Sequence, residues 1–198
     1  RMINQSTGQV DFQSTNAIDV WQNAAGNTSI AGLGTIFVKA GTYAFGSSTL
    51  NLTLADAYVL SFIAEAGTIV TGNATKMVDV TNAGYGSAQA NSERMTLENI
   101  KFQHTTQSTA DVTLDLIAAQ ANLKNIKVVN ENATRQGIGL QCGKGNASSP
   151  SGLPITWENV FSYKYSSGII IGVAHLTGIN FQAYQPLDYG ISIHDTFD

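Results

Sequence analysis

Leu97-Glu98-Asn99-Ile100-Lys101-Phe102 is the stretch that decides the fold, because the chain repeats it. The copies are residues 123–128 (Leu-Lys-Asn-Ile-Lys-Val), 157–162 (Trp-Glu-Asn-Val-Phe-Ser) and 176–181 (Leu-Thr-Gly-Ile-Asn-Phe). Their third positions are Asn99, Asn125, Asn159 and Gly178. Asparagine and glycine tolerate positive φ better than most residues, so a sharp bend is expected at this position. The bend would join two short strands whose apolar residues point inward.

A second element alternates with the first and is a triplet with apolar ends. Its copies are residues 78–80, 114–116, 138–140, 169–171 and 191–193, and the last three follow Gly137, Gly168 and Gly190. Such alternation predicts a strand with one buried face. Successive triplets begin 22 to 36 residues apart, and a coil of three short strands and three turns takes roughly 20–25 residues. The chain therefore reads as an all-β solenoid of stacked parallel strands, in which longer spacings carry insertions.

The whole chain, residues 1–198, is interpreted as a single domain, because roughly 100–200 residues usually form one. Residues 12–45 would form the N-terminal cap and the first strands, and residues 46–198 the coils. Insertions are expected at residues 81–94, 103–111 and 143–154. The first and third share one phase of the repeat, and the second lies at a different corner. Insertions at one phase of a solenoid project from one face, which is often the binding face; the alternative is tolerated slack, since loops lengthen at little cost.

Both ends of a solenoid need a cover, since an open coil leaves an apolar cross-section in water. Residues 16–25 have an apolar stripe at helical spacing, with Asn16 as the N-cap and Gly26 as the stop. This predicts a helix that caps the first coil. The last predicted strand, residues 191–193, has no such element after it. We therefore expect further chain, or another subunit of the same protein, to cover the C-terminal coil.

The composition excludes several partners. Charged residues make up 12% of the chain and the net charge is −4, so neither nucleic acid nor a membrane surface is expected as a partner. No apolar run approaches the roughly 20 residues of a membrane span. Cys142 is the only cysteine, which rules out a disulfide framework within the chain and a zinc set. It is interpreted as a buried structural thiol.

Asparagine acceptor patterns bear on the compartment. Asn-x-Ser/Thr occurs at Asn4, Asn27, Asn51, Asn73, Asn132 and Asn146. Six such patterns are about twice what the composition gives by chance. The chain is either simply rich in asparagine and threonine, or it is a secreted glycoprotein modified at these positions.

Two runs near the N-terminus resemble the opening of a known family. They are residues 16–25 (Asn-Ala-Ile-Asp-Val-Trp-Gln-Asn-Ala-Ala) and 34–43 (Gly-Thr-Ile-Phe-Val-Lys-Ala-Gly-Thr-Tyr). With the repeated Leu-x-Asn-Ile-x-Phe coils, they are similar to the pectate-lyase-like β-helix superfamily, which includes pectate lyases, polygalacturonases and phage tailspikes. Lys39 stands where proline is common in that family. The resemblance covers about residues 12–195. It implies a right-handed parallel β-helix, an extracellular, cell-surface or virion location and a carbohydrate partner, although one fold hosts many chemistries.

No catalytic motif of the superfamily carries over. The Asn-Thr-Asp, Asp-Asp, Gly-His-Gly and Arg-Ile-Lys motifs of polygalacturonases are missing. Pectate lyases use calcium-binding aspartates and an arginine base. Asp79 and Asp115 occupy equivalent, outward-facing positions in two adjacent predicted coils. The equivalent positions in the next three coils hold Gly139, Ile170 and Ser192. The two aspartates are interpreted as solvated carboxylates. The alternative is a catalytic pair, in a lyase with Ca²⁺ or in a hydrolase whose carboxyls lie about 6.5–9.5 Å apart.

Two glutamates form another candidate pair. Glu98 and Glu158 share a phase of the repeat, but Lys124 lies between them at that phase. A ladder of alternating charges is the simpler interpretation. No three side chains have the spacing of metal ligands, so no metal site is expected.

Histidines are weak candidates. His194 and Asp195 are the remaining acid–base candidates, but adjacent residues on a strand point to opposite faces. His104 and His175 are single residues that we expect at the surface or in turns.

Aromatic residues indicate carbohydrate binding better than the candidate catalytic residues indicate catalysis. Trp157 holds an inward position of the repeat and is expected in the core. Tyr163 and Tyr165 follow it and are expected to be exposed, and Tyr184 and Tyr189 lie one coil further on. These four tyrosines are the predicted carbohydrate contacts, because sugar rings stack on aromatic faces.

Two functions remain as hypotheses. The first is a surface or virion module of tailspike or adhesin type, without a cofactor, that binds a polysaccharide or glycan or builds a spike. The second is a lyase or glycoside hydrolase that acts on an acidic polysaccharide, with Ca²⁺ if it is a lyase. The missing motifs and the low charge favour the first, and whether the chain is an enzyme stays open.

Overall fold

The computed structural model describes residues 2–3, 10–27, 33–54, 59–82, 94–106, 108–109, 111–116, 120–142, 154–172 and 175–193. Its elements are β1 (Met2–Ile3), β2 (Val10–Phe12), α1 (Ala17–Asn27), β3 (Leu33–Val38), β4 (Thr42–Gly46), β5 (Leu50–Leu54), β6 (Val59–Gly72), β7 (Lys76–Asn82), β8 (Arg94–His104), β9 (Val112–Leu116), β10 (Gln120–Asn130), β11 (Ile138–Cys142), β12 (Pro154–Tyr163), β13 (Ser167–Ile171), β14 (His175–Tyr184) and β15 (Tyr189–Ile193).

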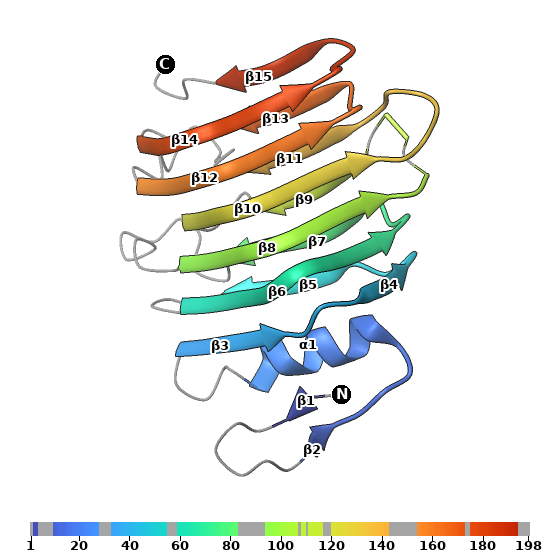
Figure 1. Cartoon of the computed structure of the whole chain (residues 1–198), viewed down its shortest axis with the longest axis vertical. Helices are drawn as coiled ribbons and strands as arrows, with labels where there is room; N and C mark the ends of the chain where they lie inside the picture. Colours follow the sequence, from blue (N-terminus) through green and yellow to red (C-terminus); the bar gives the residue numbers. More distant parts are fainter. Residues whose placement is uncertain are drawn as a thin grey trace.

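Two parallel sheets stack the strands into a column (Figure 1). The first sheet has the order β14-β12-β10-β8-β6-β3, with β4 also paired to β6, and the second has the order β15-β13-β11-β9-β7-β5. From β5 to β15, consecutive strands alternate between the two sheets. Only the short pair of β1 and β2 is antiparallel among the described strands. The arrangement is a parallel β-helix, which confirms the predicted architecture.

Strands of the first sheet bend sharply in the middle. The first half of β6 pairs with β3 and the second half with β4, so one strand serves two faces of the coil. In the strands that follow, the bend falls on Asn99, Asn125, Asn159 and Asn180, whose φ angles are 61°, 53°, 56° and 56°. The asparagine corners lie in register from coil to coil. The sequence predicts the first three of them.

The fourth corner is Asn180, so the prediction of Gly178 is wrong by two residues. Gly178 pairs with Trp157 in the neighbouring strand. A Cβ on Gly178 would lie 2.9 Å from the ring of Phe181, and this ring packs edge-on against Trp157, with centroids 5.9 Å apart. Gly178 therefore leaves room for an aromatic pair instead of forming the corner.

A slip of two residues also occurs in one strand of the second sheet. Residues 140–142 pair with residues 114–116, two positions later than predicted. The glycines that align across the coils are Gly139, Gly168 and Gly190. A Cβ on Gly139 would lie 2.6 Å from the backbone oxygen of Gly168, and one on Gly168 would lie 2.6 Å from that of Gly190. This column requires glycine because the coils approach too closely for a side chain.

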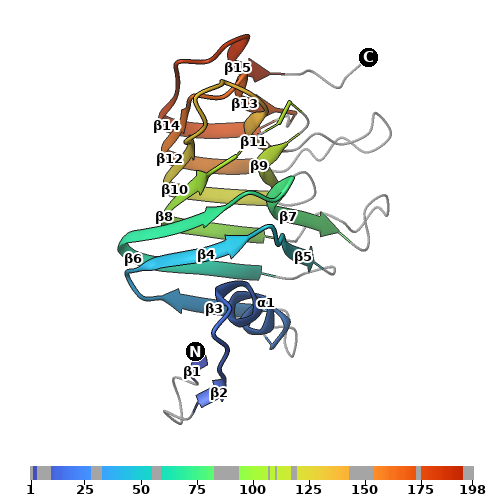
Figure 2. The same ribbon diagram turned by 90° about the vertical axis from the view of Figure 1, so that its right-hand side faces the viewer.

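Helix α1 covers the first coil, as predicted (Figure 2). Asn16 is its N-cap, since Asn16 Oδ1 accepts a hydrogen bond from the backbone N–H of Ile18 at 3.3 Å. Trp21 is stacked on Phe62 with ring centroids 5.2 Å apart. The helix continues one residue beyond Gly26, so that glycine does not stop it where we expected. Among the described residues, no helix has the length and apolar character that a bilayer span requires.

Two polar aromatic side chains, Tyr165 and His104, lie deeper than predicted, whereas Trp157 is fully buried as expected. Tyr165 was expected at the surface but is 0% exposed, and its hydroxyl lies 2.8 Å from Thr113 Oγ1. His104, expected at the surface or in a turn, is also buried, with Nε2 2.7 Å from the carbonyl oxygen of Ala74. The partner of Tyr165 lies two coils away in β9, and that of His104 lies in the neighbouring coil. These contacts compensate for the burial of the two atoms, whereas the buried Nδ1 of His104 has no hydrogen-bond partner.

Cys142 is a buried thiol in β11, as predicted. Burial raises the pKa of this thiol to about 12. The reactive thiolate is therefore scarce at neutral pH, and the side chain contributes packing instead of chemistry.

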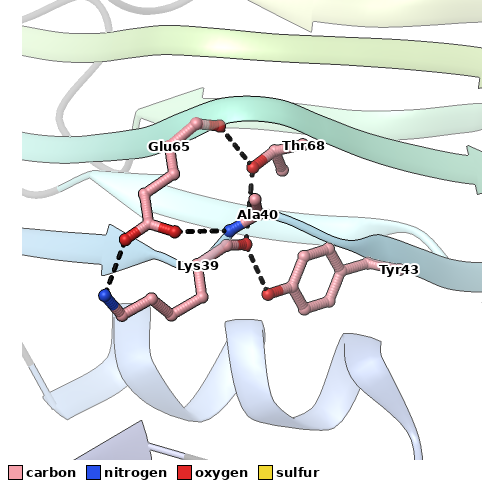
Figure 3. Close-up of polar contacts among 5 residues, drawn as sticks. All are labelled: Lys39, Ala40, Tyr43, Glu65 and Thr68. Atoms are coloured by element: carbon pink, nitrogen blue, oxygen red, sulfur yellow. Dashed lines mark hydrogen bonds and ion pairs between the residues drawn. The ribbon is translucent and has the colours of Figure 1, made fainter.

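A salt bridge occupies the first corner, where the later coils use asparagine (Figure 3). Lys39 Nζ lies 2.6 Å from Glu65 Oε1, and the backbone N–H of Ala40 donates to Glu65 Oε2 at 3.0 Å. The Tyr43 hydroxyl donates to the carbonyl of Lys39 at 2.8 Å. Thr68 Oγ1 donates to the carbonyl of Glu65, also at 2.8 Å. Lys39 therefore stabilises this corner through both its side chain and its carbonyl.

Glu65→Gln is expected to lower the melting temperature at pH 7, and the difference should shrink as the pH falls below 4.5. The backbone N–H of Ala40 and the ammonium of Lys39 hold the pKa of Glu65 below its ordinary value of 4.5. A carboxyl whose pKa is depressed by folding stabilises the protein above its unfolded pKa, and the effect is lost as the pH falls through the folded pKa. Thermal unfolding across this range should show the two melting temperatures converging. A gap that is still complete at low pH would contradict the assignment.

Candidate functional site

The outer face of the first sheet, beyond the asparagine corners, carries the candidate site. There the outward residues form two rows across the coils. The first row is Lys101, Lys127, Phe161 and Gln182, and the second is Gln103, Val129, Tyr163 and Tyr184. Of these, Val129 is buried. An open groove of about 350 Å³, which we call the corner groove, is lined by Asn125, Ile126, Lys127, Asn159, Phe161 and Asn180.

The corner asparagines form a side-chain ladder along this groove. Asn125 Nδ2 donates to Asn99 Oδ1 at 2.7 Å, and Asn99 Nδ2 donates to the carbonyl of Ala64 at 3.0 Å. Asn159 Nδ2 donates to Asn125 Oδ1 at 2.8 Å. Asn180 Nδ2 donates to Asn159 Oδ1 at 2.7 Å. An amide has two N–H groups and two lone pairs, so the ladder leaves hydrogen-bonding capacity for a ligand.

Aromatic rings lie beside the ladder. Phe161 and Tyr184 are stacked, with centroids 6.3 Å apart and 30° between the ring planes. Tyr163 pairs in register with Tyr184, and Lys164 Nζ lies 5.7 Å from the Tyr163 centroid. Tyr184 is 48% exposed, and its hydroxyl donates to Gln182 Oε1. The structure therefore brings two of the four predicted tyrosines together on this face.

Lys127 adds a cation to the corner groove. Its neighbour in the row, Lys101, lies 3.9 Å from Glu131. Within the described part of the chain, no carboxylate lies at ion-pair distance from Lys127. The groove thus combines amides, an aromatic ring and an unpaired ammonium group.

The predicted charge ladder is present in part on the other side of the corners, because only one of its two contacts is within ion-pair distance. Glu98, Lys124 and Glu158 occupy paired positions in three adjacent strands. Lys124 Nζ lies 3.7 Å from Glu158 Oε2. This lysine separates the two glutamates, as expected, so they do not form a pair of carboxyls.

Asp79 and Asp115 are paired in adjacent strands of the second sheet, as predicted. Lys76 Nζ binds both, at 3.1 Å from Asp79 Oδ2 and 2.6 Å from Asp115 Oδ2. The side chain of Asp115 is 2% exposed and its Oδ1 has no hydrogen-bond partner. The interpretation of two solvated carboxylates is therefore wrong for Asp115. The next residue at this phase is Gln141 and not Gly139.

The other predicted positions are dispersed. Tyr189 is 64% exposed but begins β15, in the second sheet, and does not line the corner groove. Of the acceptor asparagines, Asn51 and Asn73 are exposed, Asn132 is half-buried and Asn27 ends α1. Positions that lie outside the described residues are Asn4, Asn146, His194, Asp195 and the central parts of two predicted insertions, residues 83–93 and 143–153.

In the ranges that the structure describes, no three His, Cys, Asp or Glu side chains gather where they could hold a metal ion. No protein-family model, curated protein or solved structure matches the chain.

Sequence reasoning missed Lys127 and the corner asparagines as members of the site. A usable signal was present, because Lys127, Phe161 and Gln182 each lie two residues after a corner asparagine. That offset places all three on the same outward row. The hydrogen bonds of the ladder have no counterpart in the linear sequence.

Proposed function

We propose that this chain is an extracellular β-helix module that binds a glycan in the corner groove. The stacked rings of Phe161 and Tyr184 beside the asparagine ladder carry the proposal. Sugar rings present C–H groups that pack on aromatic faces, and side-chain amides can both donate to and accept from hydroxyl groups. The amides recur at the strand spacing of about 4.8 Å. Repeated donors and acceptors suit a chain of sugars better than a single one.

The same proposal assigns the chain to a superfamily and to a location. A parallel β-helix with a capping helix supports membership of the pectate-lyase-like superfamily, with the cell surface or a virion as the location. The exposed acceptor asparagines Asn51 and Asn73 are consistent with a secreted glycoprotein. A role as a tailspike-like or adhesin-like module follows from glycan binding without a catalytic motif.

A second candidate function is a lyase or hydrolase that acts on an acidic polysaccharide. It is supported by the pairing of Asp79 with the buried Asp115. Lys76 Nζ forms ion pairs with both carboxylates, so the cluster is a structural salt bridge and not a free pair of carboxyls. The binding module is therefore favoured. Turnover of an acidic polysaccharide that disappears in Asp115→Asn, but persists in corner-groove variants, would reverse this preference.

Tyr184→Ala is expected to weaken glycan binding about tenfold. An aromatic anchor in a binding site typically contributes more than about 1 kcal/mol. A glycan array first identifies the ligand, and titration calorimetry then compares the variants. Phe161→Ala, which removes the stacking partner, should have a similar effect. Phe37→Ala is the matched control, since Phe37 is 65% exposed and lies on β3, outside the groove. Absence of binding on the array, or equal losses of glycan affinity in all three variants, would contradict the proposal.

A further inference from the structure

Of the six described residues that line the corner groove, only Lys127 is charged. Its side chain is exposed, and no described carboxylate lies at ion-pair distance from it. Its partner in the neighbouring strand is a second lysine, Lys101, and like charges at opposed positions on neighbouring strands are destabilising. Lys101 is compensated by Glu131, which lies 3.9 Å away, but Lys127 is not. An anion supplied by a ligand would relieve this repulsion.

An aromatic ring lies in register with this ammonium group. Lys127 pairs with Phe161 of β12, and paired residues on adjacent strands are about 4.8 Å apart. Phe161 is stacked on Tyr184. Two residues earlier in each strand, the amides of Asn125 and Asn159 line the groove. One acidic sugar fits this arrangement, because its C–H face can pack on the ring while its anionic group meets the ammonium group.

Among the described residues, the neighbouring coils add no free cation to the groove. In the coil of β14, the outward row continues with Gln182 and the corner is Asn180, and both are uncharged. In the coil of β8, Lys101 is already paired with Glu131. Lys164 packs over an aromatic ring and does not line the groove. One uncompensated positive charge is therefore surrounded by positions that are neutral or already paired.

We propose that the corner groove selects a glycan in which one acidic sugar is flanked by neutral sugars. The inference rests on glycan binding in this groove and adds the class of glycan. Lys127 binds the anionic group, a carboxylate or a sulfate, and Phe161 packs against the same sugar ring. A polymer that is acidic at every sugar would place further anions beside Gln182 or Glu131. Those anions would lose hydration without gaining a counter-charge.

A glycan array of matched sets tests this class of ligand. Each set has one backbone in four forms: with a single uronic acid between neutral sugars, with that carboxyl reduced, with a sulfate in its place, and with a uronic acid at every position. We expect the singly acidic forms to bind about tenfold more tightly than the reduced and fully acidic forms, which is the effect of one charge-assisted hydrogen bond. The tighter of the two singly acidic forms identifies the anion. Salt should weaken the preference, because Lys127 is exposed.

Variants of the lysine row show which side chain reads the charge. Lys127→Met should lower the affinity for the singly acidic form about tenfold, to that of the reduced form, and leave binding of the reduced form unchanged. Lys127→Arg keeps the charge and should preserve most of the preference. Lys101→Met is the matched control, since Lys101 lies in the same row but is paired with Glu131. Titration calorimetry compares the four proteins, and thermal unfolding checks that each is folded.

Two results would overturn the inference and leave the proposed function in place. The first is equal binding of the singly acidic and reduced forms, and the second is tightest binding of the fully acidic form. In both cases Tyr184→Ala would still weaken binding, because an aromatic face serves neutral and acidic sugars alike. Equal losses of affinity in Lys127→Met and Lys101→Met would also contradict the assignment to Lys127. If no form of any backbone binds, the proposed function fails as well.

Discussion

Gly139→Ala is expected to lower the free energy of unfolding by about 3 kcal/mol, near the upper end of the usual cost of overpacking. The added Cβ would lie 2.3 Å from Ser162 Oγ and 2.6 Å from the backbone oxygen of Gly168. Ser162 can rotate, but the Gly168 oxygen belongs to β13, which is hydrogen-bonded to β11 in register. Relief requires the two coils to move apart. For a chain of this length, the loss corresponds to a fall in melting temperature of roughly 6–12 °C.

Gly26→Ala is the matched control for this substitution. A Cβ on Gly26 would meet no atom within 4 Å, and the residue lies in α1. Alanine has a higher helix propensity than glycine by up to about 1 kcal/mol, so a small gain in stability is expected. Urea unfolding of both variants measures the difference. Similar values for the two would show that the glycine column is not closely packed.

Strand register could be predicted from the sequence only to within two residues. Alternation fixes which face a residue takes, and a slip of two keeps every inward residue inward. Gly178 and Asn180 both tolerate positive φ, so residue type alone does not decide which of them forms the corner. The edge-on contact of Phe181 with Trp157 is specific to the observed register. That contact joins different coils, so no local pattern encodes it.

Only part of the candidate site could be predicted, because the rest depends on turns and register that no local pattern marks. Tyr163 and Tyr165 have the same parity on a strand, and alternation places both at the surface. Lys164 between them has a φ of 64°, which ends the alternation and directs Tyr165 into the core. Lysine is an unusual residue at positive φ, so nothing in the sequence marks this turn. The stacking of Phe161 on Tyr184 likewise depends on register across the coils.

Lys76→Met is expected to lower the free energy of unfolding by about 2–3 kcal/mol. Removing one partner of a buried ion pair typically costs about 3–5 kcal/mol, because the other charge stays buried without compensation. Lys76 is 35% exposed, so water partly replaces it and the cost falls below that range. Asp115 is 2% exposed and its Oδ1 has no partner. The contact with Lys76 Nζ at 2.6 Å is therefore the main compensation for this carboxylate.

The double variant Lys76→Met/Asp115→Leu should regain most of this loss, because apolar residues of similar volume often replace a buried ion pair without net cost. Lys39→Met is the matched control, since its partner Glu65 is solvent-exposed and such pairs contribute little. Urea unfolding of the single and double variants yields the coupling energy between Lys76 and Asp115. A loss that persists in the double variant would assign the cost to packing of the lysine stem. Equal effects of Lys76→Met and Lys39→Met would instead mean that Lys76 does not neutralise Asp115, and the catalytic alternative would then gain support.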